Sequence, residues 1–303
     1  MITPPSLQTG DTIGIIAPAR NIGQNELAPA LKIFQSWNLN VKTGKNLFNK
    51  YHQFAGKDEE RASDLQEMIN NPDIKAIFCA RGGYGTVRTI QYIKWEKLVQ
   101  NPKWIIGYSD ITTLHSHVNN NLNIKTLHGI MPLNFPADGK ENQSLLLLKK
   151  ILFGEKIEFS WDSTFKTLQD SRAEGILTGG NLSVLYSLIG TPYDFDTANK
   201  ILFLEDLDEY LYHVDRMMMN LKLAKKFENC AALLIGGMTD MNDNNTPFGK
   251  SAYEIIEDVM HPYKIPVFYN CPVGHLKNNF PLILGEKAII ARRKNKINLK
   301  FTA

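Results

Sequence analysis

Short apolar runs alternate with helix-like segments through the first 135 residues, and this alternation restricts the fold more than any other feature. The runs at 12–17, 76–80 and 104–106 are nearly continuous in apolar residues, which is typical of strands buried on both faces. The segment 58–70 carries Ala62, Leu65, Met68 and Ile69 at helical spacing. Strands that alternate with helices predict βαβ units and a mostly parallel sheet.

A second region rich in strands follows after a change of pattern. Residues 136–173 hold one expected helix, 145–153, and then polar residues with weak periodicity. From 174 onward we expect a helix at 214–225 and strands at 201–204, 231–236, 266–269, 282–284, 288–291 and 297–301. A chain of 303 residues is long enough for two domains of ordinary size. We therefore predict an N-terminal domain over 1–155, a linker over 156–173 and a second domain over 174–303.

Composition argues against several classes of protein. The net charge is only +3, and we interpret the one basic cluster, 292–294, as the solvated end of a hairpin, so no nucleic-acid partner is expected. No apolar run approaches the roughly 20 residues of a membrane span, and the N-terminus does not resemble a signal peptide. The three cysteines lie in apolar runs without CxxC spacing, which predicts buried thiols in a reducing compartment and therefore a cytoplasmic protein. We expect no metal and no cofactor.

Ser109 lies in the sharpest local feature of the sequence, Gly107-Tyr108-Ser109-Asp110. An expected strand ends at Gly107 and an expected helix begins after Asp110, so the serine falls on a tight strand-to-helix turn. Such a turn exposes the hydroxyl beside backbone N–H groups that can stabilise an oxyanion. Because Ile111 stands where the G-x-S-x-G pattern has its last glycine, the match is incomplete, and Ser109 is equally well interpreted as a helix N-cap.

A glycine-rich loop, Arg81-Gly82-Gly83-Tyr84-Gly85, follows the preceding strand. It has three interpretations: a turn that requires positive φ, a phosphate-binding loop, or a backbone nest that supplies an oxyanion N–H. The spacing of a phosphate-binding loop is absent. Since this loop and Ser109 both follow the carboxyl ends of parallel strands, where sites gather, the third interpretation gains support.

Two further residues are candidates for acid–base chemistry. Glu205 follows the apolar run 201–204 and opens an acidic cluster that extends to Glu209, so we expect it at a strand end and partly buried. The cluster could also be a solvated loop. His275 follows the strand at 266–269, and of the seven histidines it is the best placed to face a cleft from a strand-end loop.

Several motifs in one order resemble the LD-carboxypeptidase family of serine peptidases, which includes microcin-immunity peptidases. The resemblance runs over nearly the whole chain and is carried by Gly10-Asp11-Thr12-Ile13, Ala17-Pro18, the loop Arg81 to Gly85, Ile106-Gly107-Tyr108-Ser109-Asp110, Leu127-His128-Gly129, Gly179-Gly180-Asn181-Leu182, Leu204-Glu205-Asp206, Asp215-Arg216-Met217 and Gly274-His275. One departure is Ala19, because members of the family commonly have serine after the proline.

The resemblance implies a Ser-His-Glu triad, with Ser109 as nucleophile, His275 as general base and Glu205 as the orienting carboxylate. It implies an oxyanion hole from backbone N–H groups at Gly83 and Asp110. It also implies a Rossmann-like N-terminal domain, a smaller β-rich C-terminal α/β domain and a homodimer. The implied reaction is release of the terminal D-alanine from murein tetrapeptides in cytoplasmic peptidoglycan recycling.

Two alternatives remain open at this stage. One keeps the triad but acts on a peptide–nucleotide or acyl-amino-acid substrate, as a microcin-immunity peptidase or amidase does. The other is a ligand-binding protein without catalysis, in which the three residues serve as caps and ion pairs. A carboxypeptidase must also bind a free carboxylate, and Arg81, beside the glycine-rich loop, is a candidate for this role.

Overall fold

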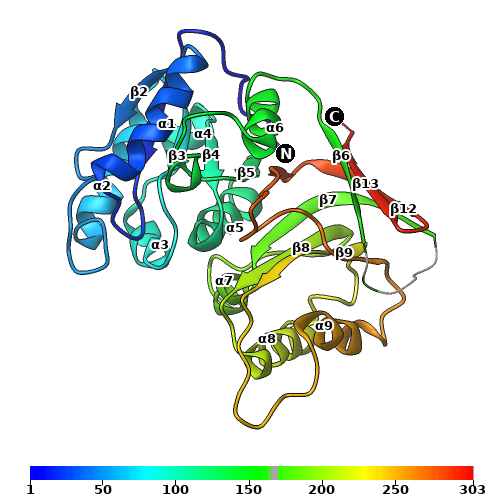
Figure 1. The fold of residues 1–303 in the computed structure, drawn as a ribbon. Helices are drawn as coiled ribbons and strands as arrows, with labels where there is room; N and C mark the ends of the chain where they lie inside the picture. Colours follow the sequence, from blue (N-terminus) through cyan, green and yellow to red (C-terminus); the bar gives the residue numbers. More distant parts are fainter. Residues whose placement is uncertain (164, 166–169, 303) are drawn as a thin grey trace. The chain divides into compact units, whose positions relative to one another are not determined.

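The computed structural model describes residues 1–163, 165 and 170–302, which divide into two compact units. The first comprises Met1–Lys156 and Phe280–Ile283, and the second comprises Ile157–Asn279 and Leu284–Ala303. Each unit has its own sheet. The mixed α/β architecture confirms the predicted fold class (Figure 1).

The first unit is built on a sheet of order β11-β5-β4-β3-β1-β2, in which β1 to β5 run parallel. Its strands are β1 (Thr12–Ile16), β2 (Asn40–Thr43), β3 (Ile74–Cys79), β4 (Trp104–Gly107), β5 (Thr126–His128) and β11 (Leu282–Leu284). Four of the five residues of β1, and all of β4, are buried. This double-sided burial is the reason β1 and β4 are apolar at nearly every position rather than at alternate ones.

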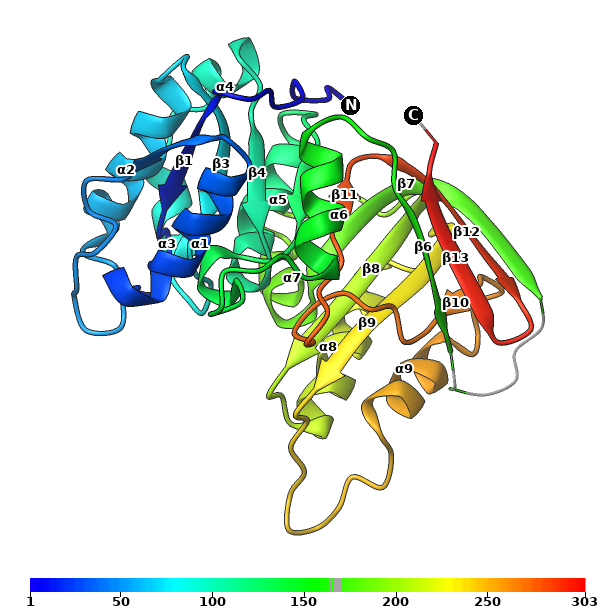
Figure 2. The same cartoon turned by 45° about the horizontal axis from the view of Figure 1, so that its top comes forward.

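Helices cover both faces of this sheet (Figure 2). They are α1 (Gln24–Ser36), α2 (Asp58–Asn70), α3 (Thr86–Thr89), α4 (Glu96–Gln100), α5 (Thr112–Asn120) and α6 (Gln143–Leu152), with short 3-10 turns at Ile90–Tyr92, Ser109–Ile111 and Pro132–Asn134. The predicted helical face of α2 is confirmed, because Ala62, Leu65, Met68 and Ile69 are all buried.

The strand order β2-β1-β3-β4-β5 identifies where a ligand can bind in the first unit. In an open parallel sheet of this order the chain turns to opposite sides after β1 and after β3, which leaves a crevice at their carboxyl ends. The loop that follows β3 is the glycine-rich loop from Arg81 to Gly85, and Ser109 follows β4, the next strand across. The sequence motifs therefore gather at one edge of the sheet.

The second unit is built on a sheet of order β10-β9-β8-β7-β12-β13-β6. Its strands are β6 (Glu158–Asp162), β7 (Ser171–Asn181), β8 (Lys200–Leu207), β9 (Ala232–Thr239), β10 (Val267–Phe268), β12 (Lys287–Arg293) and β13 (Lys296–Phe301). Strands β7 to β10 are parallel, whereas β12, β13 and β6 continue the sheet antiparallel.

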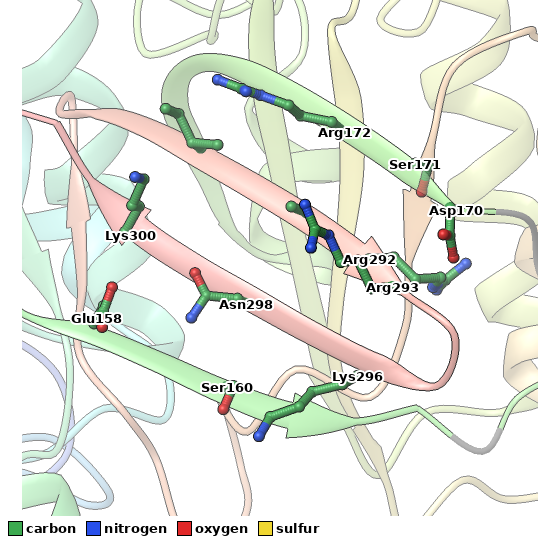
Figure 3. Close-up of a pocket in the computed structure, with 12 residues that line it drawn as sticks. Glu158, Ser160, Asp170, Ser171, Arg172, Arg292, Arg293, Lys296, Asn298 and Lys300 are labelled. Carbon is green, nitrogen blue, oxygen red and sulfur yellow. The ribbon is translucent and has the colours of Figure 1, made fainter.

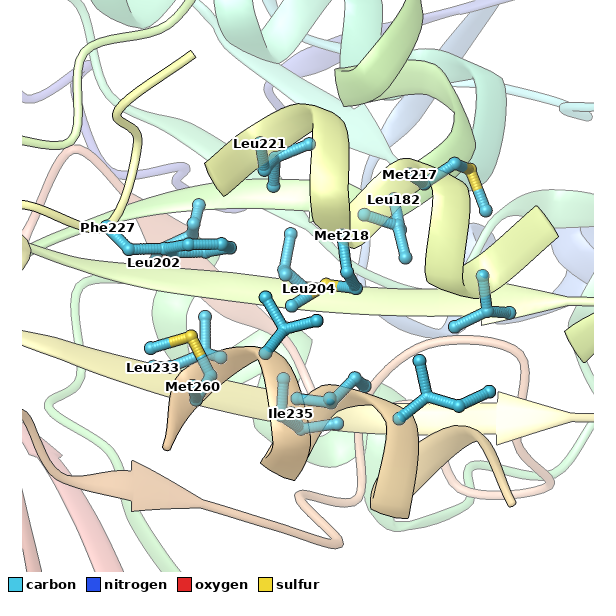
Figure 4. Close-up of a cluster of buried hydrophobic side chains, with 14 of the residues drawn as sticks. Leu182, Leu202, Leu204, Met217, Met218, Leu221, Phe227, Leu233, Ile235 and Met260 are labelled. Carbon is cyan, nitrogen blue, oxygen red and sulfur yellow. The ribbon is translucent and has the colours of Figure 1, made fainter. Parts of the chain in front are cut away.

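Three helices, α7 (Leu182–Leu188), α8 (Leu211–Leu223) and α9 (Ala252–Met260), bury their apolar sides against the parallel strands. Leu202, Leu204 and Leu233 from the sheet meet Met217 and Met218 of α8 in this core (Figure 4). The methionines of α8 are thus core residues. All three cysteines are free and buried, as the sequence predicted.

Part of the predicted linker is a strand. Glu158–Asp162 forms β6 and pairs with β13 in the second sheet. Its side chains alternate between exposed and buried positions, with Phe159 and Trp161 inward, a period of two that the interpretation as an irregular linker missed. Residues 164 and 166–169 of the predicted linker lie outside the described residues.

The basic cluster at the hairpin end is also less exposed than predicted. Arg292 is only 4% exposed, and its guanidinium lies 5.7 Å from the centroid of the Phe268 ring. The turn itself falls at Lys294, whose φ of 54° is left-handed. The predicted solvated end therefore describes Arg293 and Lys294 but not Arg292.

Candidate active site

Ser109 occupies a strained strand-to-helix turn in the first unit. Strand β4 ends at Gly107, and the 3-10 turn Ser109–Ile111 leads into α5. Ser109 has φ of 64°, a left-handed conformation that a residue with a side chain rarely adopts and that concentrates at functional sites. The N-cap of the 3-10 turn is Tyr108 and that of α5 is Ile111, so the interpretation of Ser109 as an N-cap is wrong.

Buried hydrogen bonds on both sides hold this turn. The carboxylate of Asp110 accepts the backbone N–H of Thr86 at 2.8 Å, which ties the turn to the start of α3. Burial raises the pKa of Asp110 above its usual range, although the Thr86 contact opposes the shift. On the other side, Nε2 of His115 lies 2.9 Å from the carbonyl oxygen of Gly107. Burial lowers the pKa of His115 to about 4, so the neutral ring donates to that carbonyl.

The glycine-rich loop lies directly against Ser109. A Cβ atom on Gly82 would lie 3.0 Å from the Cβ and 3.2 Å from the Oγ of Ser109, so only glycine lets the loop approach this closely. The next residue, Gly83, has φ of 105°. The peptide joining Gly82 to Gly83 therefore lies beside the serine. Its N–H and that of Asp110, which directly follows Ser109, are the two donors that the resemblance implied for an oxyanion hole.

Glu205 and His275 form a hydrogen-bonded pair in the second unit. Oε2 of Glu205 lies 2.7 Å from Nδ1 of His275 and accepts the backbone N–H of the same histidine at 3.2 Å. The glutamate side chain is fully buried and that of the histidine is 15% exposed. The structure thus brings these two predicted residues together. A carboxylate on Nδ1 fixes the tautomer that leaves Nε2 able to accept a proton.

Glycine at position 274 allows this contact. Gly274 has φ of 106°, and a Cβ there would lie 2.6 Å from Oε2 of Glu205. Its own N–H donates to Oδ1 of Asn279 at 2.9 Å, and the next carbonyl, that of His275, accepts the hydroxyl of Thr239 at 2.8 Å. The backbone that carries His275 is therefore fixed on both sides.

A bulge in β8 brings two adjacent carboxyl groups to one partner. The sequence predicted a partly buried residue after the strand, but β8 continues to Leu207 and Glu205 lies within it. The pairing of β8 with β9 shifts register between Leu204 and Asp206, and such a bulge redirects side chains that would otherwise alternate. Glu205 and Asp206 are consequently both buried and both bonded to Asn181.

Asn181 is the functional candidate that sequence reasoning missed. Its Oδ1 accepts the N–H of Val184 at 3.1 Å as the N-cap of α7, and the hydroxyl of Ser183 at 2.9 Å. This fixes the amide, so Nδ2 donates to Oε1 of Glu205 at 3.3 Å and to Oδ1 of Asp206 at 2.9 Å. The signal available in the sequence was an asparagine directly before a helical segment, which is a typical N-cap.

The two carboxyl groups set the charge of the site. Burial disfavours the imidazolium of His275, but the hydrogen bond and charge of Glu205, together with the charge of Asp206, outweigh burial and raise the pKa of His275. Burial, followed by the nearby charge of Glu205, raises the pKa of Asp206 to about 7. The two carboxyl groups therefore favour the protonated imidazole of His275, which is the form that a histidine reaches when it accepts a proton from a neighbouring group.

One other groove in the described part of the chain lies away from the predicted site residues. A groove of about 760 Å³ lies over the outer face of β6, β13, β12 and β7, and Figure 3 shows Arg172, Arg293, Lys296 and Lys300 around it. It contains none of the predicted site residues. In the part of the chain that the structure describes, no group of three or more His, Cys, Asp or Glu residues could hold a metal ion, and no helix is long and apolar enough to cross a membrane.

The comparisons with known proteins cover both units. Residues 13–129 match the LD-carboxypeptidase N-terminal domain, and residues 174–290 match the LD-carboxypeptidase C-terminal domain. The chain is 34% identical over 289 residues to a probable murein peptide carboxypeptidase of Bacillus subtilis, with 94% of this chain and 90% of the relative covered. It is 24% identical over 326 residues to a microcin self-immunity protein of Escherichia coli, covering 94% and 91% of the two chains.

A solved structure of a related carboxypeptidase has the same fold as this chain. The crystal structure of muramoyltetrapeptide carboxypeptidase from Oxalobacter formigenes superposes with a TM-score of 0.87 at 28% identity, covering 96% of this chain and 99% of that one. The two domain models match in the expected order, and a relative is similar over nearly the whole length of the chain. These matches and the shared fold agree with the motifs around Ser109 and Glu205. The chain belongs to the LD-carboxypeptidase family of peptidases.

Proposed function

We propose that this protein is a serine LD-carboxypeptidase that releases the terminal D-alanine from murein tetrapeptides. In this proposal Ser109 is the nucleophile, His275 the general base, and Glu205 the carboxylate that orients the base. Backbone N–H groups of Gly83 and Asp110 form the oxyanion hole, and Arg81 contributes to substrate binding.

One observation carries the proposal more than any other: a fully buried carboxylate bonded at 2.7 Å to Nδ1 of a histidine, in a chain whose serine has left-handed backbone at a strand end. A buried ion-pair partner alone could be structural. The strained serine with a glycine loop against its side chain has no such structural explanation, because a glycine at 109 would adopt the same turn without strain.

The proposed reaction has two halves. His275 takes the proton of Ser109 as Oγ attacks the carbonyl carbon before the terminal D-alanine, and the carbonyl oxygen becomes an oxyanion. In comparable sites each oxyanion donor is worth about 3–4 kcal/mol. The C–N bond then breaks, and His275 returns its proton to the leaving amine of D-alanine. A water molecule, deprotonated by His275, hydrolyses the acyl-enzyme and restores the serine hydroxyl.

The cellular setting of the proposal is peptidoglycan recycling in the cytoplasm, and the assembly is a homodimer. Family resemblance supports both, and the three free, buried cysteines agree with a reducing compartment. Light scattering of the purified protein measures the assembly directly, where a mass of one chain would contradict the dimer.

The decisive experiment compares the parent protein with Ser109→Ala on a murein tetrapeptide that ends in D-alanine, with free D-alanine followed by mass spectrometry. We expect release by the parent and a loss of about 10⁶-fold in the variant. Equal release by both proteins would exclude Ser109 as nucleophile.

The microcin-immunity alternative predicts a different outcome in the same assay. If neither protein releases D-alanine but the parent cleaves an acyl-amino-acid or peptide–nucleotide conjugate and Ser109→Ala does not, then the triad is correct and the substrate class is not. The likeness to the Escherichia coli self-immunity protein is the reason to include that substrate.

A further inference from the structure

Two arginines meet at the crevice of the first sheet. Arg20 lies four residues beyond the end of β1, and Arg81 lies two residues beyond the end of β3. These two strands flank the point where the chain turns to opposite sides of the sheet, which is where open parallel sheets bind their ligands. Together with Asn21 and Gln53, the two arginines line a cavity of about 180 Å³.

Hydrogen bonds to main-chain carbonyl groups hold the walls of this cavity. The N–H of Arg20 donates to the carbonyl of Gly82 at 3.4 Å, and that of Asn21 donates to the carbonyl of Gln53 at 3.1 Å. Nη1 of Arg81 donates to the carbonyl of Asn21 at 3.0 Å. The segment after β1 is thus fastened to the glycine-rich loop on one side and to the 53–55 loop on the other.

The guanidinium of Arg20 donates no hydrogen bond to any residue in the described part of the chain. Nη1 of Arg81 lies 4.0 Å from Oε1 of Glu26, which is a long and weak ion pair. Arg20 is exposed and forms no ion pair with any residue that the structure describes. A guanidinium presents a planar fork of N–H donors that matches a carboxylate. Two such groups around one small cavity favour an anion with two oxygens as the ligand.

The cavity is coupled to Ser109 through the glycine-rich loop. Gly82 contacts Ser109, and a Cβ on the following residue, Gly83, would collide with Cδ of Arg20. Consecutive Cα atoms are about 3.8 Å apart. One side of this short loop therefore faces the nucleophile while the adjacent position carries the arginine. The carboxylate of a terminal amino acid is separated from the scissile carbonyl by only the amide nitrogen and one Cα, so the group that binds it must lie close to the nucleophile, as this loop places Arg20.

We propose that Arg20, together with Arg81, binds the free C-terminal carboxylate of the substrate and thereby makes the enzyme a carboxypeptidase. This inference rests on the proposed function, because it needs Ser109 as the nucleophile. It assigns to Arg20 a role in substrate selection: a peptide with an amidated C-terminus loses the ion pair and is processed poorly.

The test uses two substrates and a matched control. A tetrapeptide ending in D-alanine and the same peptide ending in D-alanine amide are given to the parent, Arg20→Gln and Arg293→Gln, the last an exposed arginine in the second unit. For Arg20→Gln we expect kcat/KM on the free acid to fall about 10- to 100-fold, since a hydrogen bond to a charged group contributes about 1.5–3 kcal/mol. The loss should appear mainly in KM, because the carboxylate does not change during the reaction.

The amide substrate distinguishes carboxylate binding by Arg20 from a role in the oxyanion hole or in loop structure. Arg20→Gln should leave the already low rate on the amide within about threefold, and Arg293→Gln should change neither rate. An equal loss on acid and amide would instead place Arg20 at the oxyanion or in loop structure and overturn the proposal. An unchanged rate on the acid would overturn it as well.

A binding measurement keeps this inference distinct from the proposed function. Calorimetry with Ser109→Ala measures the affinity for the uncleaved free acid and amide, and the Ser109→Ala, Arg20→Gln double variant should lose the preference for the acid. If the parent releases no D-alanine yet the acid binds through Arg20, the proposed reaction fails and the carboxylate site stands. If the parent releases D-alanine and the double variant still prefers the acid, the proposed reaction stands and the carboxylate site at Arg20 is wrong.

Discussion

Replacing Glu205 with glutamine tests the pair at the centre of the proposed triad with almost no change in shape. Every hydrogen-bond partner described for the Glu205 side chain is a donor: the ring and backbone nitrogens of His275 at one oxygen and the amide of Asn181 at the other. A carboxylate accepts from both directions, whereas an amide accepts at one end only. Whichever way the substituted amide turns, its NH₂ group faces another donor.

The magnitude follows from these contacts. If the amide oxygen faces His275, the ring keeps its tautomer but loses a charge-assisted bond worth about 1.5–3 kcal/mol, whereas the buried NH₂ group that meets Asn181 costs about 1–3 kcal/mol of stability rather than rate. If the amide turns over, the histidine takes the wrong tautomer. At about 1.36 kcal/mol per tenfold change in rate, we expect kcat to fall by about 10- to 100-fold in the first case and by up to about 10⁴-fold in the second. The upper end matches the loss when a triad carboxylate becomes an amide.

The assay measures kcat for D-alanine release by Glu205→Gln, with thermal unfolding recorded to show that the variant is folded. Glu174→Gln is the matched control, because Glu174 lies on a strand of the same sheet and forms exposed ion pairs with Lys287 and Arg172. The control should keep kcat within about threefold, as expected for an exposed pair. A folded Glu205→Gln protein that retains more than a tenth of the parental kcat would refute the reasoning.

Two further predictions concern pH and stability. Because the Glu205 hydrogen bond and charge and the charge of Asp206 raise the pKa of His275 despite burial, kcat/KM should fall on acidification from above pH ~6.5, the ordinary histidine value, as the base gains a proton. Because the pKa of Asp206 is itself raised to about 7, this carboxyl is only partly ionised on the acid limb, so Asp206→Asn should move the limb slightly to lower pH; a move to higher pH would contradict the electrostatic account. In the first unit, the buried guanidinium of Arg61 donates to the carbonyl oxygens of Pro18 and Gly85 and pairs with Asp58. Arg61→Met should therefore lower the free energy of unfolding in urea by about 3–5 kcal/mol, whereas the matched change at exposed Arg88, which shares the Asp58 partner, should have a much smaller effect.

The parallel strands were the easiest elements to predict. Strands β1, β3, β4 and β8 are buried on both faces, so their residues are apolar at nearly every position and stand out without any alignment. The elements that were missed have weaker or different signals. Strand β6 alternates over only five residues, and α9 begins with a capping box in which Ser251 and Glu254 bond each other's backbone. That S-x-x-E pattern is visible in the sequence and would have located the helix.

The sequence pointed to the candidate residues of the site but not to the contacts that hold them. Ser109, Glu205 and His275 follow or occupy strand ends, where position along the chain is informative. The roles of Asn181 and Asp206 depend on a shift in register between β8 and β9. A register shift arises from pairing between strands that are distant in sequence, so no local period records it. For the same reason the contact between Gly82 and Ser109 could not be derived from either loop alone.

Irregular backbone and chemical candidates coincide in both units, and this coincidence has a physical basis. A regular strand points successive side chains to opposite faces, so it does not turn two adjacent carboxyl groups toward one amide. Regular backbone also does not place a serine hydroxyl directly against a neighbouring loop. Ser109 achieves the first with a left-handed residue, and β8 achieves the second with a bulge. Each departure is offset by buried hydrogen bonds: Asp110 to Thr86 beside the serine, and Asn181 to both carboxyl groups beside the histidine. Strain that is stabilised from so many directions is expected to persist only where function requires it.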